Sequence, residues 1–183
     1  MSIRQQLFLL TISFLIASTV YCKTKAEWKS RIIYQVLTDR YSRTDGGTGG
    51  CDIAANNYCG GTFKGIQNNL DYIQNMGFDA LWISPVVQNT PGGYHGYWAK
   101  DLYKINENFG TQQDLLDLVA ECHRRNIWVM VDVVANHVGP IGSDFSQISP
   151  FNKPEHYHDE CDINQDDFLH NQWRVEVIFC YNH

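Results

Sequence analysis

Short apolar runs mark three strands along the chain. Runs of apolar and β-branched residues, bounded by charged residues, turn residues or proline, occupy 32–37, 80–83 and 128–134. The third run is apolar almost throughout, which is typical of a strand buried on both faces of a parallel sheet. We therefore expect three buried strands.

Helical periodicity fills the intervals between these strands. Apolar side chains recur every three or four residues over 62–76, and Gly77 suits the left-handed end of a helix. A second helix is expected to begin after Thr111, a favourable N-cap, and to end near Arg125, where a cation suits the helix dipole. This order of strands and helices predicts an α/β fold with a parallel sheet, either open or part of a barrel. A (β/α)8 barrel takes about 250 residues, so the chain has room for the first three units of one.

Two long loops interrupt this pattern. Residues 42–61 are rich in Gly, Asn and Thr, whereas residues 86–109 are dense in Gly, Tyr, His and Trp. Loops longer than about 12 to 15 residues without regular structure are usually functional. We therefore expect the second loop to carry binding residues.

The first residues predict an export signal. Arg4 precedes an apolar run over 7–20, which is shorter than the stretch of about 20 residues that a membrane-spanning helix needs. We expect a signal peptide at 1–22, cleaved between Ala17 and Cys22, and a secreted, extracellular chain. An uncleaved membrane anchor is the alternative. No second apolar run of spanning length follows.

Composition and charge narrow the class of ligand. The 183 residues are 44% hydrophobic, which suits one packed domain of ordinary size. The formal net charge of −6 provides no basic stripe for a phosphate backbone, so nucleic acid is not expected as a partner. An uncharged ligand fits better.

Cysteines become informative once export is expected, because disulfides persist outside the cell. Cys51 and Cys59 bracket a short Asn-rich stretch with turn chemistry, so a bridge between them could close a small local loop. Cys122 falls on the buried face of the second predicted helix, where a free thiol behaves as a small hydrophobe.

Two groups of residues carry candidate chemistry. Residues 132–137 place polar side chains directly after the third strand, and the carboxyl ends of strands form the active-site face of a barrel. There Asn136 offers an oxygen that Ca²⁺ accepts, and His137 offers a hydrogen-bonding ring. The aromatic segment 94–98 offers ring faces for sugars and polar tips for hydroxyls. The alternatives are a turn with a satisfied histidine and a loop that packs over the sheet.

Together these segments resemble the alpha-amylase family of glycoside hydrolases, in particular its secreted fungal-type members. The resemblance covers about 28–176. It rests on these blocks, in this order: WKSR (28–31), LTDRY (37–41), YCGGT (58–62), LDYI (70–73), MGF (76–78), ISP (83–85), YHGYW (94–98), NENFG (106–110) and DVVANH (132–137).

The resemblance assigns roles to residues after the second and third strands. It implies that His95, Tyr97 and Trp98 bind substrate, with Tyr97 stacking on the sugar that is cleaved. It also implies that Cys51 and Cys59 form a family disulfide. Asn56 differs from close relatives, which carry a substrate-contacting glutamine there.

Further roles are implied at the end of the third strand. In similar enzymes the residue at Asn136 binds a structural Ca²⁺, the residue at His137 hydrogen-bonds the sugar at the cleavage site, and Asp132 supports the site from the strand. The implied cofactor is therefore Ca²⁺, and the implied partners are starch, glycogen or maltooligosaccharides. We expect a monomer with no membrane contact after removal of the signal.

The implied fold is a partial (β/α)8 barrel with an inserted domain. Residues 23–138 would form the N-terminal part of the barrel, and 139–176 would begin a loop-rich, calcium-binding second domain. Cys161 matches the first cysteine of a second family bridge. Residues 177–183 depart from the family pattern, Cys180 included, which we interpret as an aberrant or truncated terminus.

The implied activity is retaining endo-hydrolysis of α-1,4-glucosidic bonds by two carboxylates. Relatives carry these groups after the fourth and fifth strands, beyond His183, so no catalytic residue is assigned and the chain is expected to be inactive in this form. One alternative is a non-catalytic glycan-binding chain. Another is a family member that transglycosylates or cleaves pullulan.

Overall fold

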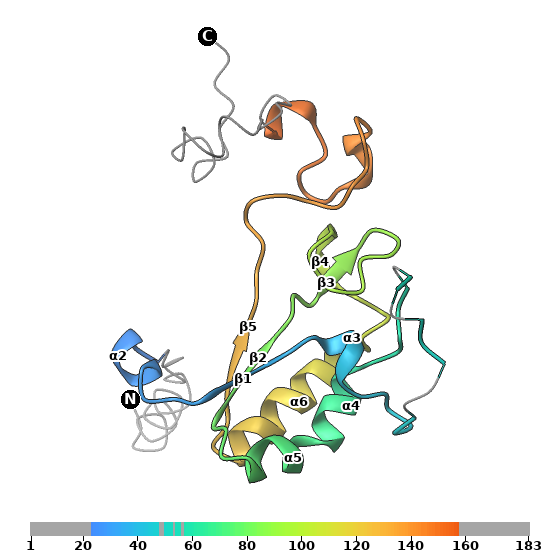
Figure 1. Cartoon of the computed structure of the whole chain (residues 1–183). Coiled ribbons are helices and arrows are strands. Elements are labelled where there is room, and N and C mark those ends of the chain that lie inside the picture. The colour runs from blue at the N-terminus through green and yellow to red at the C-terminus, as the bar shows by residue number, and fades with distance from the viewer. Residues whose placement is uncertain (1–22, 48–49, 53, 56, 158–183) are drawn as a thin grey trace, which may run out of the picture. The chain divides into compact units, whose positions relative to one another are not determined.

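The computed structural model describes residues 23–47, 50–52, 54–55 and 57–157 (Figure 1). The predicted signal peptide, Asn56, Cys161, Cys180 and residues 177–183 lie outside these residues. The chain divides into two compact units, 1–31 and 32–183. In the first, helix α2 (Lys25–Trp28) begins with a capping box in which Thr24 and Glu27 bind each other's backbone amides.

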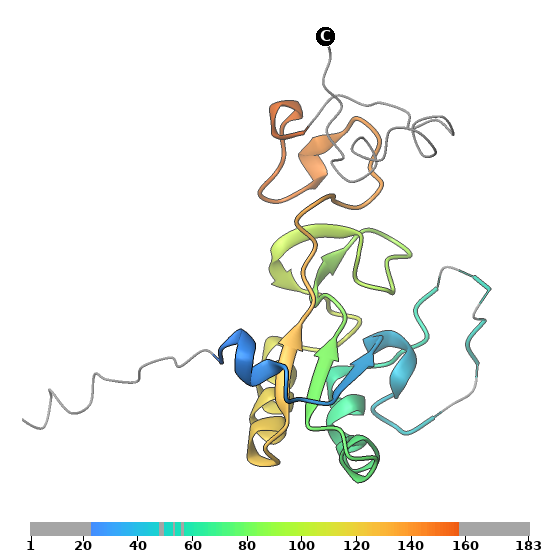
Figure 2. The ribbon, with the colours of Figure 1, turned by 60° about the vertical axis from the view of Figure 1, so that its left-hand side comes forward.

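A three-stranded parallel sheet organises the second unit. Strands β1 (Ile33–Val36), β2 (Ala80–Ile83) and β5 (Trp128–Val131) pair in the order β1-β2-β5. Val36 lies beside Ile83, which lies beside Val131, so all three carboxyl ends reach one edge. Figures 1 and 2 show the helices α4, α5 and α6 together on one side of this sheet. The predicted parallel α/β sheet is confirmed.

The helix predicted over 62–76 is in fact two helices. Helix α4 (Phe63–Asn68) and helix α5 (Leu70–Asn75) are separated at Asn69, whose backbone leaves helical geometry (φ −116°, ψ 19°). The apolar spacing continues across the break, because both helices bury one face, and for this reason the periodicity did not reveal it. Gly77 adopts the predicted left-handed conformation (φ 88°).

The second predicted helix is confirmed as α6 (Gln112–Arg124). Thr111 and Asp114 form a capping box at its start. Leu118 and Cys122 are buried on its inner face, and burial raises the pKa of the Cys122 thiol to about 12. As predicted, Cys122 is a free cysteine that packs as an apolar side chain.

The core lies between the sheet and the helices. Side chains from β2, α4, α5 and α6 meet there, and the aromatic rings of Phe63 and Phe109 pack edge to face at its centre. The core residues are Val36, Phe63, Ile66, Leu70, Ile73, Leu81, Ile83, Phe109, Leu118, Cys122 and Ile127.

The prediction that residues 128–134 are buried on both faces is wrong. The strand ends at Val131, which is 39% exposed, and Val133 is 78% exposed. The physical reason is pairing: among the described strands, β5 has β2 as its neighbour and no strand on its other side. The apolar run 128–134, which is typical of a central strand, thus lies at the edge of the described sheet.

The loop after β2 is also more regular than predicted. It contains an antiparallel hairpin of β3 (Val87–Asn89) and β4 (Ala99–Ile105), irregular in register, with the aromatic segment at its turn. A one-turn helix, α3 (Thr38–Tyr41), likewise follows β1. Helix α3 and strand β3 are too short to give a periodic signal, and β4, which has seven residues, shows no alternation of buried and exposed positions.

The chain after β5 crosses to this hairpin. The Gly139 amide donates to the Ala99 carbonyl (2.9 Å), and the Ser149 amide donates to the Lys100 carbonyl (2.9 Å). Two 3₁₀ turns follow, η1 (Phe145–Gln147) and η2 (Pro154–His156). In the part of the chain that the structure describes, no helix is long and apolar enough to cross a membrane.

A substitution at Gly65 can test how closely α4 packs against the backbone at Ser42. Helix propensity alone predicts that Gly65→Ala stabilises the helix by about 1 kcal/mol. A Cβ at this position, however, would lie 1.9 Å from the Ser42 backbone oxygen, so the backbone must shift. We expect Gly65→Ala to lower the free energy of unfolding by about 1 to 3 kcal/mol in urea denaturation. Asn68→Ala, exposed on the same helix, is the control, and a more stable Gly65→Ala chain would contradict this packing.

Candidate functional site

The candidate site forms where the aromatic loop (residues 94–98) meets the end of β5. The Tyr97 hydroxyl donates a 2.7 Å hydrogen bond to Oδ2 of Asp132. His137 Nε2 lies 3.0 Å from the Tyr97 carbonyl oxygen, which can only accept, so this nitrogen carries the proton. The other ring nitrogen of His137, Nδ1, then accepts a hydrogen bond from the side-chain amide nitrogen of Asn136 (3.2 Å). We call this meeting of Tyr97, Asp132 and His137 the junction.

His95 packs inside the aromatic loop. Its Nδ1 accepts a hydrogen bond from the Tyr97 amide (3.0 Å), and its ring stacks on the Tyr97 ring with the centroids 5.7 Å apart. The Trp98 ring lies edge to face with it at 4.9 Å. Burial, and then the nearby His137, lower the pKa of His95 below its usual value. A neutral ring is consistent with an Nδ1 that accepts.

Backbone contacts fix the shape of the aromatic loop. The Trp98 amide donates to Oδ1 of Asn89 (2.6 Å), and the Thr90 amide donates to the Trp98 carbonyl (2.9 Å). Gly96 has a left-handed backbone (φ 88°), and a Cβ there would lie 2.5 Å from the Pro85 oxygen. The rings are therefore held by hydrogen bonds at the base of the turn.

The electrostatics of the junction keep the tyrosine protonated. The hydrogen bond to Asp132, followed by burial, raises the pKa of Tyr97 to about 12. The phenol is therefore neutral at any physiological pH and remains a donor. With the rings of His95 and His137 nearby, the junction presents rings and hydrogen-bonding groups around a single carboxylate, which suits an uncharged polyhydroxyl ligand.

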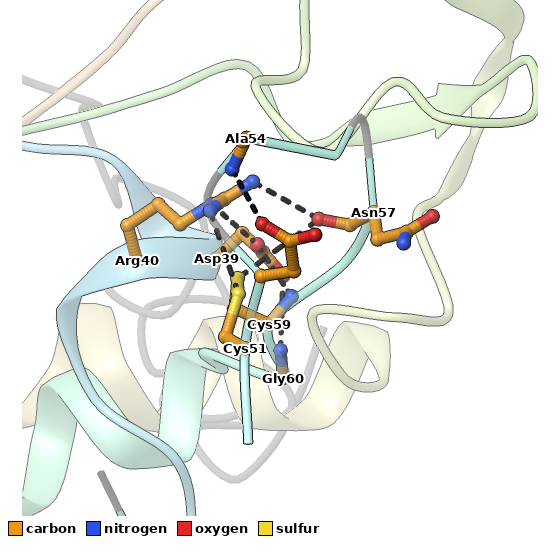
Figure 3. Close-up of a disulfide and its surroundings, with 8 residues drawn as sticks. Asp39, Arg40, Cys51, Ala54, Asn57, Cys59 and Gly60 are labelled. Atoms are coloured by element: carbon orange, nitrogen blue, oxygen red, sulfur yellow. Dashed lines mark hydrogen bonds and ion pairs between the residues drawn. A yellow bond between two sulfur atoms is a disulfide. The ribbon is translucent and has the colours of Figure 1, made fainter. Parts of the chain in front are cut away.

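The disulfide predicted between Cys51 and Cys59 is confirmed (Figure 3). The buried Asp39 carboxylate anchors its loop by accepting from the amides of Cys59 (2.8 Å) and Gly60 (3.1 Å). A cavity of about 490 Å³ lies beside this disulfide. Arg40 and Tyr94 are among the residues that line it.

Sequence reasoning assigned no role to Asp39, Arg40 or Asn89. Asp39 and Arg40 follow β1 at the edge that carries the junction, so the strand-end rule used for 132–137 would have found them. Asn89 had no such signal, because its role depends on the hairpin. The structure does bring residues predicted from two distant segments together: Tyr97, Asp132 and His137 meet at the junction, and His95 and Trp98 pack beside it.

Asn136 is exposed at the end of β5 and offers one amide oxygen. Ca²⁺ takes six to eight oxygen ligands. Among the described residues no three His, Cys, Asp or Glu side chains gather to hold a metal. The side-chain oxygen of Asn136 is a ligand type that Ca²⁺ accepts, and it would supply one ligand of such a site.

Comparison with known proteins agrees with this geometry. Residues 35–174 match the family model of the alpha amylase catalytic domain. The chain is 51% identical to an alpha-amylase of Saccharomycopsis fibuligera over 153 residues, which is 77% of this chain and 31% of that protein. It is 45% identical to alpha-amylase 3 of Schizosaccharomyces pombe over 170 residues, which is 86% of this chain and 30% of that protein.

Solved structures give the same result. An alpha-amylase from Malbranchea cinnamomea superposes with a TM-score of 0.76 and 50% identity, over 80% of this chain and 33% of that one. The acarbose complex of an alpha-amylase from Geobacillus thermoleovorans gives 0.65 and 38%, over 78% and 31%. The chain belongs to the alpha-amylase family, and its sheet is part of that family's barrel. It spans about 30% of the length of the first two relatives.

The Tyr97–Asp132 hydrogen bond predicts a pH effect. The folded pKa of Tyr97, about 12, lies above its usual value of 10, so the stabilisation is complete below pH 10 and is lost as the pH rises through 12. We expect Asp132→Asn to lower this pKa toward 10 in an ultraviolet titration, with Tyr97→Phe identifying the signal. Tyr41, whose pKa burial raises to about 12, is the internal control and should not change. An unchanged Tyr97 titration would contradict the hydrogen bond.

Proposed function

We propose that the chain supplies the sugar-binding and calcium-binding part of a secreted alpha-amylase that cleaves α-1,4-glucosidic bonds in starch or glycogen by a retaining, endo-acting mechanism. The observation that carries the proposal is the 2.7 Å bond from Tyr97 to Asp132, because it joins the aromatic loop to the strand end that holds His137 and Asn136. Family membership and the likeness to an alpha-amylase bound to acarbose support it.

Each residue of the proposed site has a physical role toward a glucose unit. The half-buried ring of Tyr97 offers a face to the C–H side of the sugar, and His95 stacks on the ring and holds it in place. Trp98 closes the edge of the same cluster. His137 is oriented by the Tyr97 carbonyl and would hydrogen-bond sugar hydroxyls when its ring turns from that oxygen.

Asp132 acts as support in this proposal. Its Oδ2 accepts a hydrogen bond from the Tyr97 hydroxyl. Its backbone amide donates a hydrogen bond to the Ile83 carbonyl (3.0 Å), which continues the pairing of the sheet. Retaining hydrolysis needs two carboxyl groups about 5 to 5.5 Å apart. The junction contributes one, already engaged, so we assign the nucleophile and the general acid to parts of the whole protein beyond these residues.

The first test is binding of maltoheptaose by the purified chain, measured by calorimetry. We expect saturable binding that Tyr97→Ala weakens at least about 10-fold, or about 1.4 kcal/mol, because the stacking face is lost. Tyr103→Ala is the matched control, since Tyr103 is 80% exposed on the same hairpin and should have no effect. The chain alone should release no reducing sugar from starch. Absence of binding, or equal effects of the two variants, would refute the proposed site.

The second test concerns calcium. Bound Ca²⁺ would tie the end of β5 to the inserted domain, so millimolar Ca²⁺ should raise the melting temperature more than Mg²⁺, which prefers a smaller, octahedral site. Asn136→Ala should reduce this protection, whereas Asn75→Ala, an exposed asparagine at the end of α5, should leave it intact. Equal protection of all three chains would exclude Asn136 as a ligand.

A further inference from the structure

Arg40 lies between two loops that are far apart in the sequence. From the one-turn helix α3, its Nη2 donates to the Asn57 carbonyl (3.0 Å) and its Nη1 contacts Sγ of Cys51 (3.5 Å). The guanidinium carbon also lies over the ring of Tyr94, 3.9 Å from its centroid. Figure 3 shows the guanidinium pointing at the disulfide and at Asn57. One planar cation thus connects the disulfide loop to the aromatic loop.

The position of this cation is itself fixed. Arg40 Nε lies 3.0 Å from Oδ2 of Asp39 as an ion pair, although the N–H does not point along a hydrogen bond. The Asp39 side chain is fully buried, the Arg40 side chain is 19% exposed, and the amides of Cys59 and Gly60 hold the carboxylate. A charge pair withdrawn from water in this way is costly to separate. The ion pair therefore favours the position of the guanidinium beside the disulfide loop.

Contacts continue from Tyr94 into the proposed sugar site. The rings of Tyr94 and His95 meet edge to face with centroids 5.1 Å apart. His95 in turn stacks on Tyr97, which binds Asp132. A displacement of Tyr94 would therefore move the ring that supports the stacking tyrosine.

We propose that Arg40 is a positioning residue, which clamps the disulfide loop against Tyr94 and so sets the aromatic loop for sugar binding. The part that concerns sugar rests on the proposed function, whereas the clamp itself does not. Lysine would not replace it, since one ammonium group cannot pair with Asp39, bind the Asn57 carbonyl and lie flat on a ring together.

The test compares Arg40→Met with Arg43→Met. Arg43 lines the same cavity and carries the same charge, but its guanidinium pairs with the exposed Asp45, so it is the matched control. The first measurement is the NMR shift of the His95 ring protons, which Tyr97 and Trp98 displace by ring currents; His95→Gln assigns the signal. Arg40→Met should move it toward the value of a free histidine, and Arg43→Met should not.

The second measurement is affinity for maltoheptaose. We expect Arg40→Met to weaken binding about 10-fold and Arg43→Met to have no effect. The double variant Arg40→Met with Tyr94→Leu should weaken binding no more than the larger of the two single changes. The reason is that the effects of substitutions within one chain of contacts are not additive. Arg40→Lys keeps the charge beside Asp39 and guards against misfolding of the methionine variant. It should show the same His95 shift, and wild-type behaviour of Arg40→Lys would overturn the clamp.

The two proposals fail in different ways. If the parent chain binds no maltoheptaose, the proposed function fails, while the His95 shift still decides the role of Arg40. If the parent binds and Arg40→Met matches Arg43→Met in both measurements, the clamp is wrong and the sugar site stands.

Discussion

The structure depends on the parallel pairing of β2 with a strand on each side. Because Val36, Ile83 and Val131 align across the sheet, the three chain segments that follow them begin at one edge. Ser84 Oγ lies 3.1 Å from Thr38 Oγ1 just past the ends of β1 and β2, and Asp132 follows directly after β5. Every contact of the junction and of the Arg40 clamp is made by these segments. The register of four-residue strands thus helps to bring together loop residues that are far apart in the sequence, such as Tyr97 and His137, which are separated by 40 positions.

At that edge, the carboxylates have partners and the rings pack against one another. Asp39 is matched by Arg40 and two backbone amides, and Asp132 by the hydroxyl of Tyr97. The histidines are oriented by backbone groups of the aromatic loop. Such a surface offers hydrogen bonds and apolar faces without a strong field. This property suits the neutral sugar of the proposed function.

Among the described residues, the same sheet ends at β1 and β5 with no further strand beside them, and this explains one failure of sequence reasoning. A run such as 128–134 is apolar because the fold to which it belongs surrounds it with neighbours, yet Val133 is largely exposed in this chain. The break at Asn69 and the hairpin strands were missed for another reason. Helix periodicity survives a single irregular residue, β3 has only three residues, and β4 shows no alternation of buried and exposed positions. Errors therefore fall where burial or pairing depends on distant neighbours.

The sequence by itself determined the parallel α/β architecture, the caps at Thr111 and Gly77, the Cys51–Cys59 bridge and the segments that carry chemistry, because each follows from local spacing or from a motif in order. Only the tertiary structure decided that Tyr97 binds Asp132, that the Tyr97 carbonyl orients His137, and that Arg40 connects the disulfide to Tyr94. These contacts join residues that are distant in sequence, and the strand register together with the hydrogen bonds of the hairpin brings them close to one another. No periodicity encodes such distances, because they arise from packing between elements.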